Sequence, residues 1–423
     1  MLPLQRIRDD PEAVRRGAEL KGESAPVDEI LELDERARRL RAEVEAARAS
    51  QRRASEALRG RPSDEQRAEL SAQKELIQEG EEELTGLEGR LTELLLLVPN
   101  PPDESVPFGE GDADNVTVRT WGEPARYDFE PLPHYELGER LALFDFDRAA
   151  KVSGSRFALL TGAGARLQRA LISFMLDVAT REHGYAEVAP PYLVRREAMV
   201  GTANLPKFEE DAFHADGGLF LIPTAEVPLT NLYREEILDG ARLPIAHVAA
   251  TPCFRREAGA AGRDTRGYIR LHQFDKVEMV RFSSPESSLD ELELLTGHGE
   301  AVLQKLGLHY RVRLMCSGDM GFAQRKKYDL EAWAPGMERW LEVSSCSDFG
   351  DFQARRANIR YRPSAGERPR FVHTLNGSGL GVPRTFDALI ETFQQADGSI
   401  TIPPVLRPYL NGVTAIVPPS ASS

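Results

Sequence analysis

The stretch from Thr251 to Glu278 decides the fold, and it reads TPCFRREAGAAGRDTRGYIRLHQFDKVE. Strand-forming residues at both ends flank a glycine-rich loop, so the stretch predicts a strand, a loop and a second strand. Because side chains alternate along a strand, the charged and aromatic residues of the second strand share one face: Arg270, His272, Phe274, Lys276 and Glu278. The opposite face is apolar, and we expect it to be buried: Leu271, Val277 and Met279.

The polar face of this strand is unsuited to a core, because it combines arginines, a carboxylate and one phenylalanine. Such a face suits a site for phosphates, an amine and a flat base. Arg255 and Glu257 share a face of the first strand in the same way. The alternative is an ordinary sheet surface that faces water, and the pattern is compatible with both interpretations.

A second polar group follows the apolar strand that begins at Leu219. This strand is interrupted by Pro223, and Thr224 and Glu226 come directly after it. The two residues suit a ligand site, but they equally suit a helix start with Thr224 as its N-cap and Glu226 in its first turn.

The segment His373–Arg384 predicts a strand, a glycine-rich turn and a helix with Arg384 in its first turn. A cation at that position opposes the helix dipole, which indicates that it is kept to meet an anion. The turn fits neither GxGxxG nor GxxxxGKS, so the dinucleotide-binding and P-loop interpretations fail.

Two runs near the N-terminus repeat apolar positions by alternating threes and fours, which is typical of a coiled coil. The first run comprises Ile30, Leu33, Ala37, Leu40, Val44, Ala47, Gln51, Ala54 and Leu58, and the second Leu70, Gln73, Ile77, Gly80, Leu84, Leu87, Leu91, Leu94 and Val98. The turn at Gly60–Ser63 separates them, and Ser63 with Gln66 predicts a capping box that opens the second helix. So short a connection predicts an antiparallel helical arm over about residues 27–98.

The first helix of this arm is rich in arginine, whereas the second has an acidic excess. The arginines are Arg36, Arg38, Arg39, Arg41, Arg48, Arg52 and Arg53. They suit either a coiled coil with many surface salt bridges or a stripe that follows a phosphate backbone, and nothing local distinguishes the two.

The composition limits the partners and the compartment. A net charge of −14 over 423 residues argues against a protein that coats nucleic acid through bulk positive charge, so any RNA contact must use local basic patches. The three cysteines lie far apart, which argues against disulfides and zinc and fits a reducing cytoplasm. We expect neither a membrane span nor a secretory signal.

The segment Pro99–Pro107 cannot continue a helix and reads as a linker. It predicts an N-terminal domain at 1–105 and a catalytic domain at 106–411. The Pro/Ser/Ala-rich tail at 412–423 is expected to be disordered.

The larger domain alternates strand pairs with helices that we expect at 162–183, 226–239 and 286–306. Strand pairs joined by loops favour a mostly antiparallel sheet. The fold class is therefore α+β, with a two-helix arm and a mostly antiparallel sheet flanked by helices.

Six motifs in this order resemble class II aminoacyl-tRNA synthetases, and specifically the bacterial seryl-tRNA synthetases. They are FRREAG at 254–259, DTRG at 264–267, HQF at 272–274, EVSSCS at 342–347, DFQARR at 351–356 and HTLNGS at 373–378. The resemblance covers about residues 1–411, with the arm as the tRNA-binding part. It implies a cytoplasmic homodimer that uses ATP and Mg²⁺ to join L-serine to tRNA(Ser), and to tRNA(Sec) where present, through a seryl-adenylate.

The resemblance also implies roles for individual residues. ATP would contact Arg255, Arg256, Glu257, Arg270, Leu271, Phe274, Glu342, Val343, Ser344, Ser345 and Arg384, of which Arg255, Glu257 and Arg384 would be catalytic. Serine would contact Thr224, Ala225, Glu226, Arg255, Glu278, Asn376 and Ser378. Glu342 and Ser345 would bind Mg²⁺, although on an ideal strand they point to opposite faces, so this role requires a bulge or a turn between them.

Three other readings remain: a class II relative that hands its amino acid to another carrier, a non-catalytic regulator, and a specialised duplicate. The first would lack the long arm. The second would be expected to lose Arg255, Glu278, Glu342 or Arg384, all of which are present. The third cannot be separated from the main reading by the residues alone.

Overall fold

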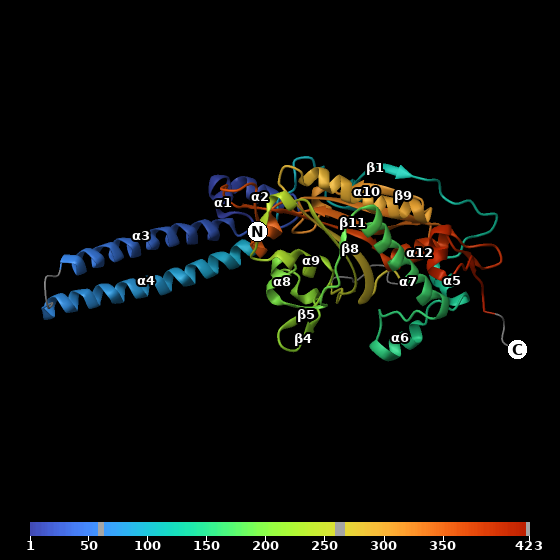
Figure 1. Ribbon diagram of the computed structural model, residues 1–423, viewed down its shortest axis with the longest axis horizontal. Helices are drawn as coiled ribbons and strands as arrows, with labels where there is room; N and C mark the ends of the chain where they lie inside the picture. The colour runs from blue at the N-terminus through green and yellow to red at the C-terminus, as the bar shows by residue number, and fades with distance from the viewer. Residues whose placement is uncertain (58–62, 259–266, 420–423) are drawn as a thin grey trace. The chain divides into compact units, whose positions relative to one another are not determined.

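A computed structural model of the chain describes residues 1–57, 63–258 and 267–419. These residues form two compact units, Met1–Pro99 and Asn100–Ser423. Figure 1 shows their elements, coloured from the N-terminus to the C-terminus.

The described residues of the first unit form four helices, α1 (Leu4–Asp9), α2 (Pro11–Glu19), α3 (Val27–Ala57) and α4 (Asp64–Leu96). The two long helices pack along the predicted seam, where Ile30, Val44 and Leu91 are buried. The predicted capping box is confirmed, because the Ser63 hydroxyl accepts from the backbone of Gln66 while the Gln66 side chain accepts from the backbone of Ser63. The predicted turn at 60–63 lies largely outside the described residues.

The two helices of the arm approach each other closely at Gly80. A Cβ atom at this position would lie 2.5 Å from Cγ2 of Val44 on the facing helix. Gly86 and Gly89 have open space at the same atom. Gly80 therefore belongs to the packing of the seam, whereas the other two glycines only weaken α4.

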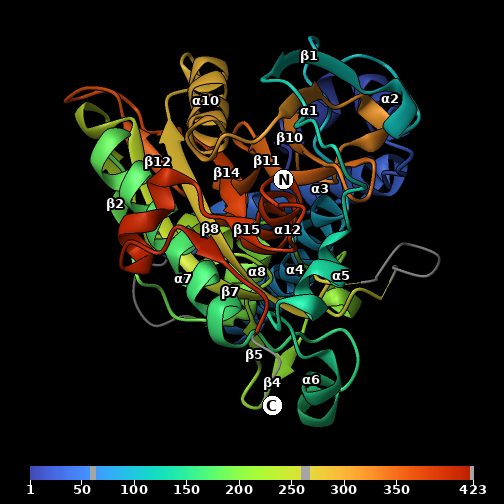
Figure 2. The ribbon, with the colours of Figure 1, turned by 90° about the vertical axis from the view of Figure 1, so that its right-hand side faces the viewer.

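The second unit is built on an eight-stranded sheet in the order β1-β9-β10-β11-β14-β8-β7-β2. The strands are β1 (Val116–Trp121), β2 (Ala186–Glu187), β7 (Ile245–Phe254), β8 (Gln273–Ser283), β9 (Tyr310–Leu314), β10 (Lys326–Ala334), β11 (Arg339–Asp348) and β14 (His373–Gly381). Every neighbouring pair is antiparallel except β2 with β7. The predicted sheet is confirmed, and Figure 2 shows β14, β8 and β7 side by side.

Three long helices pack against this sheet: α7 (Gly162–Asp177), α10 (Ser288–Leu306) and α12 (Val382–Thr392). They share one core with the apolar face of β8, where Val277 and Met279 are buried with Leu271. The expected burial of that face is confirmed. The opposite face of β8 is left to carry the polar residues.

Shorter elements complete the unit: α5 (His134–Arg140), α6 (Phe146–Ser153), α8 (Arg196–Gly201), α9 (Glu226–Thr230), α11 (Phe352–Ala357), β3 (Leu193–Arg195), β4 (His214–Ala215), β5 (Leu219–Leu221), β6 (Ile237–Asp239), β12 (Arg360–Arg362) and β13 (Arg370–Phe371). The expected helix at 226–239 is wrong beyond Thr230. The chain instead makes a short turn and enters β6, which pairs in parallel with β12 and buries Leu238 in a local core.

The expected disorder of the tail is wrong for residues 412–419. Ala415–Ile416 forms β16, which pairs with β15 (Ile400–Thr401), and the Ile416 side chain packs into the main core. Backbone pairing and the burial of Ile416 together hold this part of the tail. Residues 420–423 lie outside the described residues.

Candidate active site

A cavity of about 380 Å³ opens over the polar face of the sheet. Its walls come from the residues after β7, from β8, β11 and β14, and from the first turns of α9 and α12. Most of the predicted ATP and serine residues line it: Thr224, Glu226, Arg255, Glu257, Arg270, Leu271, Phe274, Glu342, Val343, Ser344, Ser345, Asn376, Ser378 and Arg384. Segments far apart in sequence thus converge on one site.

At one end of the cavity, the Asn376 side chain joins two carboxylates. Its Nδ2 donates to Oε2 of Glu226 at 2.9 Å and to Oε1 of Glu278 at 2.8 Å. Glu278 is fully buried, and Lys276 Nζ lies 2.5 Å from its Oε2. The Ser378 hydroxyl donates to the same oxygen at 3.4 Å. This end of the cavity is therefore rich in acceptors and suits an ammonium group and a hydroxyl.

The pKa of the Glu226 carboxyl lies well above its ordinary value. Burial, and then the nearby charge of Glu278, raises the pKa of Glu226 to about 7. Gln353 acts in the opposite direction, because its Nε2 donates to Oε1 of Glu226 at 2.6 Å. Thr374 in turn donates to Gln353 at 2.7 Å, so a buried chain of hydrogen bonds fixes the orientation of the Glu226 carboxyl.

The middle of the cavity carries one aromatic ring and two arginines. The Arg255 guanidinium lies 5.2 Å from the ring centroid of Phe274, and its Nε donates to the carbonyl of Pro223. Arg270 forms an ion pair with Glu257. Glu257 takes a left-handed backbone conformation with a φ of 52°, which is uncommon outside glycine and typical of functional sites.

At the other end, the expected β-bulge is present in β11. Leu330 of β10 pairs with Ser344, but the next residue, Glu331, pairs with Glu342, so Val343 is the extra residue. The bulge changes the side-chain alternation between Glu342 and Ser345. Both residues line the cavity as a result.

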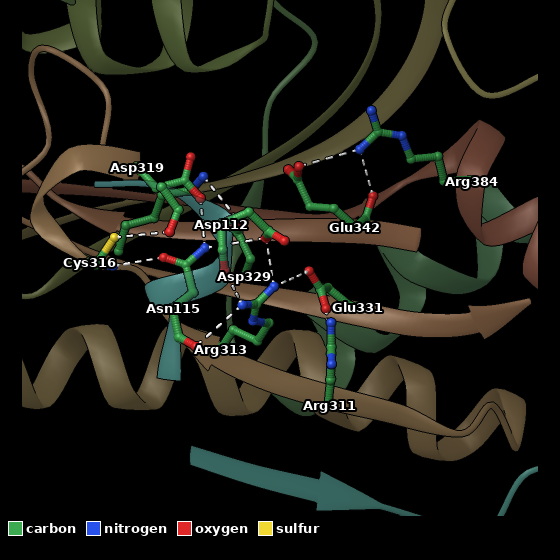
Figure 3. Close-up of polar contacts among 12 residues, drawn as sticks. Asp112, Asn115, Arg311, Arg313, Cys316, Asp319, Asp329, Glu331, Glu342 and Arg384 are labelled. Carbon is green, nitrogen blue, oxygen red and sulfur yellow. Dashed lines mark hydrogen bonds and ion pairs between the residues drawn. The ribbon is translucent and has the colours of Figure 1, made fainter. Parts of the chain in front are cut away.

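Arg384 closes this end of the site against Glu342 (Figure 3). Its Nη1 donates to the Glu342 carbonyl at 2.9 Å and lies 3.4 Å from Oε2 of the same residue. Although partial burial acts to raise the pKa of Glu342, the cations Lys327 and Arg384 outweigh it and hold that pKa below its ordinary value. The carboxylate is thus charged at neutral pH and available to a cation.

Three predicted residues do not line the cavity. Arg256 is exposed to solvent, and its backbone donates to the carbonyl of Asp211. Ala225 is buried in the local core around β6 and β12. Glu278 lies directly behind the lining residues and contributes through Asn376, Ser378 and Lys276.

Two residues that contact the carboxylates of Glu226 and Glu278 have no role predicted from the sequence. Lys276 lies on the predicted polar face of the second strand, and its position on that face could have identified it as a site residue. Gln353 belongs to the DFQARR motif, but only the fold brings α11 against the Glu226 carboxyl.

The arginines of α3 divide into two groups. Arg36 and Arg41 lie 2.5 Å from Glu83 and Glu88 of α4, and Arg48 pairs with Glu81. Arg38 pairs within its own helix with Asp34 at 3.1 Å. The remaining three are exposed and form no ion pair with any residue in the described ranges: Arg39, Arg52 and Arg53.

Comparison with known families agrees with this division into an arm and a catalytic body. Residues 1–102 match the model of the seryl-tRNA synthetase N-terminal domain. Residues 208–393 match the model of the tRNA synthetase class II core domain (G, H, P, S and T).

Individual relatives match nearly the whole chain. A serine–tRNA ligase of Thermomicrobium roseum is 56% identical, covering 97% of this chain and 94% of its own. One of Caldanaerobacter subterraneus subsp. tengcongensis is 55% identical over 97% and 98%. The structure of seryl-tRNA synthetase from Pyrococcus horikoshii complexed with ATP is similar with a TM-score of 0.93 and 39% identity, over 99% of this chain and all of that one. With both of its units matched, this chain belongs to the seryl-tRNA synthetase family.

Proposed function

We propose that the chain is a serine–tRNA ligase, which activates L-serine with ATP and transfers it to tRNA(Ser). One observation supports this assignment most strongly. A single amide, that of Asn376, joins two carboxylates at one end of the cavity, while arginines line its middle and its other end. An amino acid with a small polar side chain fits the first end, and a nucleoside triphosphate fits the second.

The serine subsite is assigned to Thr224, Glu226, Glu278 and Ser378, with Asn376 and Ala225 supporting it. Glu226 would bind the ammonium group, because its carboxylate lies at the cavity wall and carries charge above pH 7. Glu278 and Ser378 would select the hydroxyl of serine. Both are buried, so an alanine substrate would bring no hydroxyl to pair with them, and that missing hydrogen bond is the physical basis of selection.

The ATP subsite is assigned to the remainder of the cavity. Phe274 would stack on the adenine, and Arg255 would contact both the phosphates and the serine carboxylate. Arg384 and Arg270 would bind the terminal phosphates. The serine carboxylate is already a nucleophile, so these residues accelerate attack on the α-phosphate by positioning it and neutralising charge.

The residues of the bulge in β11 fit a magnesium ion. Glu342 supplies a charged carboxylate and Ser345 a hydroxyl, and oxygen ligands of this kind are what Mg²⁺ takes alongside substrate phosphates. When bound there, the ion would neutralise phosphate charge. The protein's own part is to hold both oxygens at the cavity wall.

We assign tRNA binding to the N-terminal domain predicted at residues 1–105, and to the arginines of its arm in particular. Selection through the arm and the body of the tRNA would make the anticodon unimportant and would admit tRNA(Sec) where it exists. We further propose that the enzyme works as a cytoplasmic homodimer. None of the described helices is both long and apolar enough to cross a bilayer.

The test is charging of total bacterial tRNA with serine by the wild type and by Glu278→Ala. We expect serine charging by the wild type and its loss in the variant, with a matching loss of serine-dependent ATP–pyrophosphate exchange. Deletion of about residues 30–96 should instead leave exchange largely intact and abolish charging. Charging by Glu278→Ala at the wild-type rate would remove this residue from the serine subsite.

A further inference from the structure

Three ionisable side chains form a cluster beside the helix that carries Arg384, outside the lining of the cavity. His134 is the first residue of α5, and Asp387 and Glu391 lie four residues apart on α12. All three side chains are fully buried. Nδ1 of His134 lies 2.9 Å from Oε1 of Glu391, and Nε2 lies 3.7 Å from Oδ2 of Asp387. The imidazole ring therefore stands between two carboxyl groups of one helix.

The Glu391 carboxyl is well supplied with hydrogen-bond donors. Its Oε1 accepts from the backbone of His134 at 2.8 Å and faces Nδ1 of the same residue. Its Oε2 accepts from the backbones of Gly336 at 2.9 Å and Met337 at 3.2 Å. Because the carboxyl acts here as an acceptor, we assign a proton to Nδ1 of His134. The charge of the imidazole is then decided at Nε2, the atom that faces Asp387.

The Asp387 carboxyl lacks such donors. Neither of its oxygens accepts a hydrogen bond from any residue within the described ranges, and a buried carboxylate of this kind requires a nearby cation or a proton. Burial raises the pKa of Asp387 to about 7, and among the groups that act to lower this pKa the charge of His134 is the strongest. Although burial acts to lower the pKa of His134, Asp387 and Glu391 outweigh it and raise that pKa. His134 is therefore the main counter-charge of Asp387.

The other charged groups around Asp387 include one that the reaction needs. Arg384 precedes Asp387 by three residues on α12, a spacing that places both side chains on one face of the helix. Arg384 and Arg339 both act to lower the pKa of Asp387, Glu391 acts to raise it, and Asp387 acts to raise the pKa of the buried Tyr268. Without His134, the arginines would be the remaining counter-charges of an ionised Asp387.

His134 also contacts a second segment that orients Arg384. A Cβ atom at Gly267 would lie 2.3 Å from Nε2 of His134, so the backbone at this glycine lies directly against the imidazole ring. Two residues further along, the carbonyl of Ile269 accepts from Nε of Arg384 at 3.4 Å. The ring therefore touches both α12 and the segment 267–269, which together hold the Arg384 side chain at the cavity.

We propose that His134 is a positioning residue for serine activation, because it neutralises the Asp387 carboxylate and so leaves the Arg384 guanidinium to the ATP phosphates. This inference rests on the proposed function and adds to it a residue that does not itself touch ATP. An ionised Asp387 without the imidazole would attract Arg384 across one turn of α12. The phosphates would then compete with a carboxylate for that arginine.

His134→Asn tests this role, since an asparagine amide can replace Nδ1 as the donor to Glu391 but places no group at Nε2. The readout is KM for ATP in serine-dependent ATP–pyrophosphate exchange, at about pH 7 and about pH 9. Loss of the imidazole raises the pKa of Asp387 further, so this carboxyl is protonated at the lower pH and becomes charged toward the higher one. We expect KM for ATP of the variant to rise by about 10-fold over this range, the effect of weakening one charge-assisted contact. The wild-type KM for ATP and the KM for serine of both proteins should stay nearly constant.

Removal of the carboxylate provides the decisive comparison. The double variant His134→Asn, Asp387→Asn has no charge at position 387 to attract Arg384, so its KM for ATP should return to the wild-type value at both pH values. A purely structural role of His134 would not be restored by a second substitution in the same buried cluster. His298→Gln is the control, because His298 is another buried histidine, and its Nδ1 lies 3.0 Å from the Tyr185 hydroxyl. Its KM for ATP should match that of the wild type.

Two results would overturn the role of His134. One is a KM for ATP in His134→Asn that equals the wild-type value at both pH values, and the other is a rise that Asp387→Asn does not reverse. If His134→Asn does not fold, Asp387→Asn alone decides, because it should keep the wild-type KM for ATP, and a rise of about 10-fold would contradict the proposal. Absence of serine exchange in the wild type would instead overturn the proposed function.

Discussion

Glu342 and Ser345 line the same cavity although they lie three residues apart on one strand, because a β-bulge at Val343 lies between them. A regular strand would send one of the two side chains to the opposite face. The bulge is therefore the local feature that assembles an oxygen-rich pair at the phosphate end of the site.

Glu342→Gln should raise the Mg²⁺ concentration needed for half-maximal ATP–pyrophosphate exchange. We expect a rise of at least about 10-fold, the loss that even outer partners of a metal can give. Glu331→Gln is the matched control, because Glu331 pairs with Glu342 across the strands but contacts Arg311 instead of the cavity. An unchanged Mg²⁺ dependence in Glu342→Gln would remove this residue from the metal site.

The raised pKa of Glu226 predicts a pH dependence of serine activation. The carboxyl is protonated below about 7 and charged above it, and only the charged form attracts the ammonium group of serine. We therefore expect kcat/KM for serine to rise by about 10-fold per pH unit up to about pH 7 and then to level off. Glu226→Gln should lower the plateau and remove the inflection. The same inflection in that variant would assign the titration to another group.

Asn376→Ala should reduce serine activation by about 10- to 100-fold, the range expected for a hydrogen bond to a charged group. The amide is the common donor to Glu226 and Glu278, so its loss leaves two carboxylates without their shared partner. ATP–pyrophosphate exchange with alanine should fall much less. The ratio of the exchange rate with serine to that with alanine should therefore decrease. Steady-state exchange with both amino acids measures this ratio, and equal losses for the two would contradict a role in selecting the hydroxyl.

Alanine substitutions at two glycines of α4 should change the stability of the arm in opposite directions. Gly86→Ala should stabilise the arm by about 1 kcal/mol, because the site is open and alanine favours a helix. Gly80→Ala should destabilise it, since the added methyl group would lie 2.5 Å from Val44. Amide hydrogen exchange of α3 and α4 in the full chain measures both effects. Stabilisation by Gly80→Ala would show that the two helices can move apart at this position without loss of stability.

The unpaired arginines of α3 should contribute more to tRNA binding than the paired ones. Replacing Arg39, Arg52 and Arg53 with glutamine should raise KM for tRNA and reduce its salt dependence by about one unit of logarithmic slope for each phosphate that is no longer neutralised. Replacing Arg36, Arg41 and Arg48 should chiefly loosen the arm, because these residues pair with glutamates of α4. Equal effects on KM and slope from both triple variants would contradict this division.

Much of the fold could be predicted because its signals are periodic. The three-four repeat identified the seam residues Ile30, Val44 and Leu91, and the alternation along β8 identified the buried Val277 and Met279. Cavity residues that lie within a distinctive motif could be predicted as well, including Glu342 and Ser345 on either side of the bulge.

The remaining features depend on packing that sequence patterns do not encode. Gln353 acquires its role only when α11 lies against Glu226, and Arg256 is directed to solvent although its neighbours line the cavity. β6 and β16 are too short to show a period, and each combines backbone pairing with one buried aliphatic side chain, Leu238 or Ile416.

ATP–pyrophosphate exchange with each standard amino acid, followed by charging of total tRNA with the amino acid that supports it, tests whether the chain is a serine–tRNA ligase. Serine alone should support rapid exchange, and the same enzyme should then charge tRNA with serine. Rapid exchange with a different amino acid, or exchange with serine that leads to no charged tRNA, would contradict the proposed function.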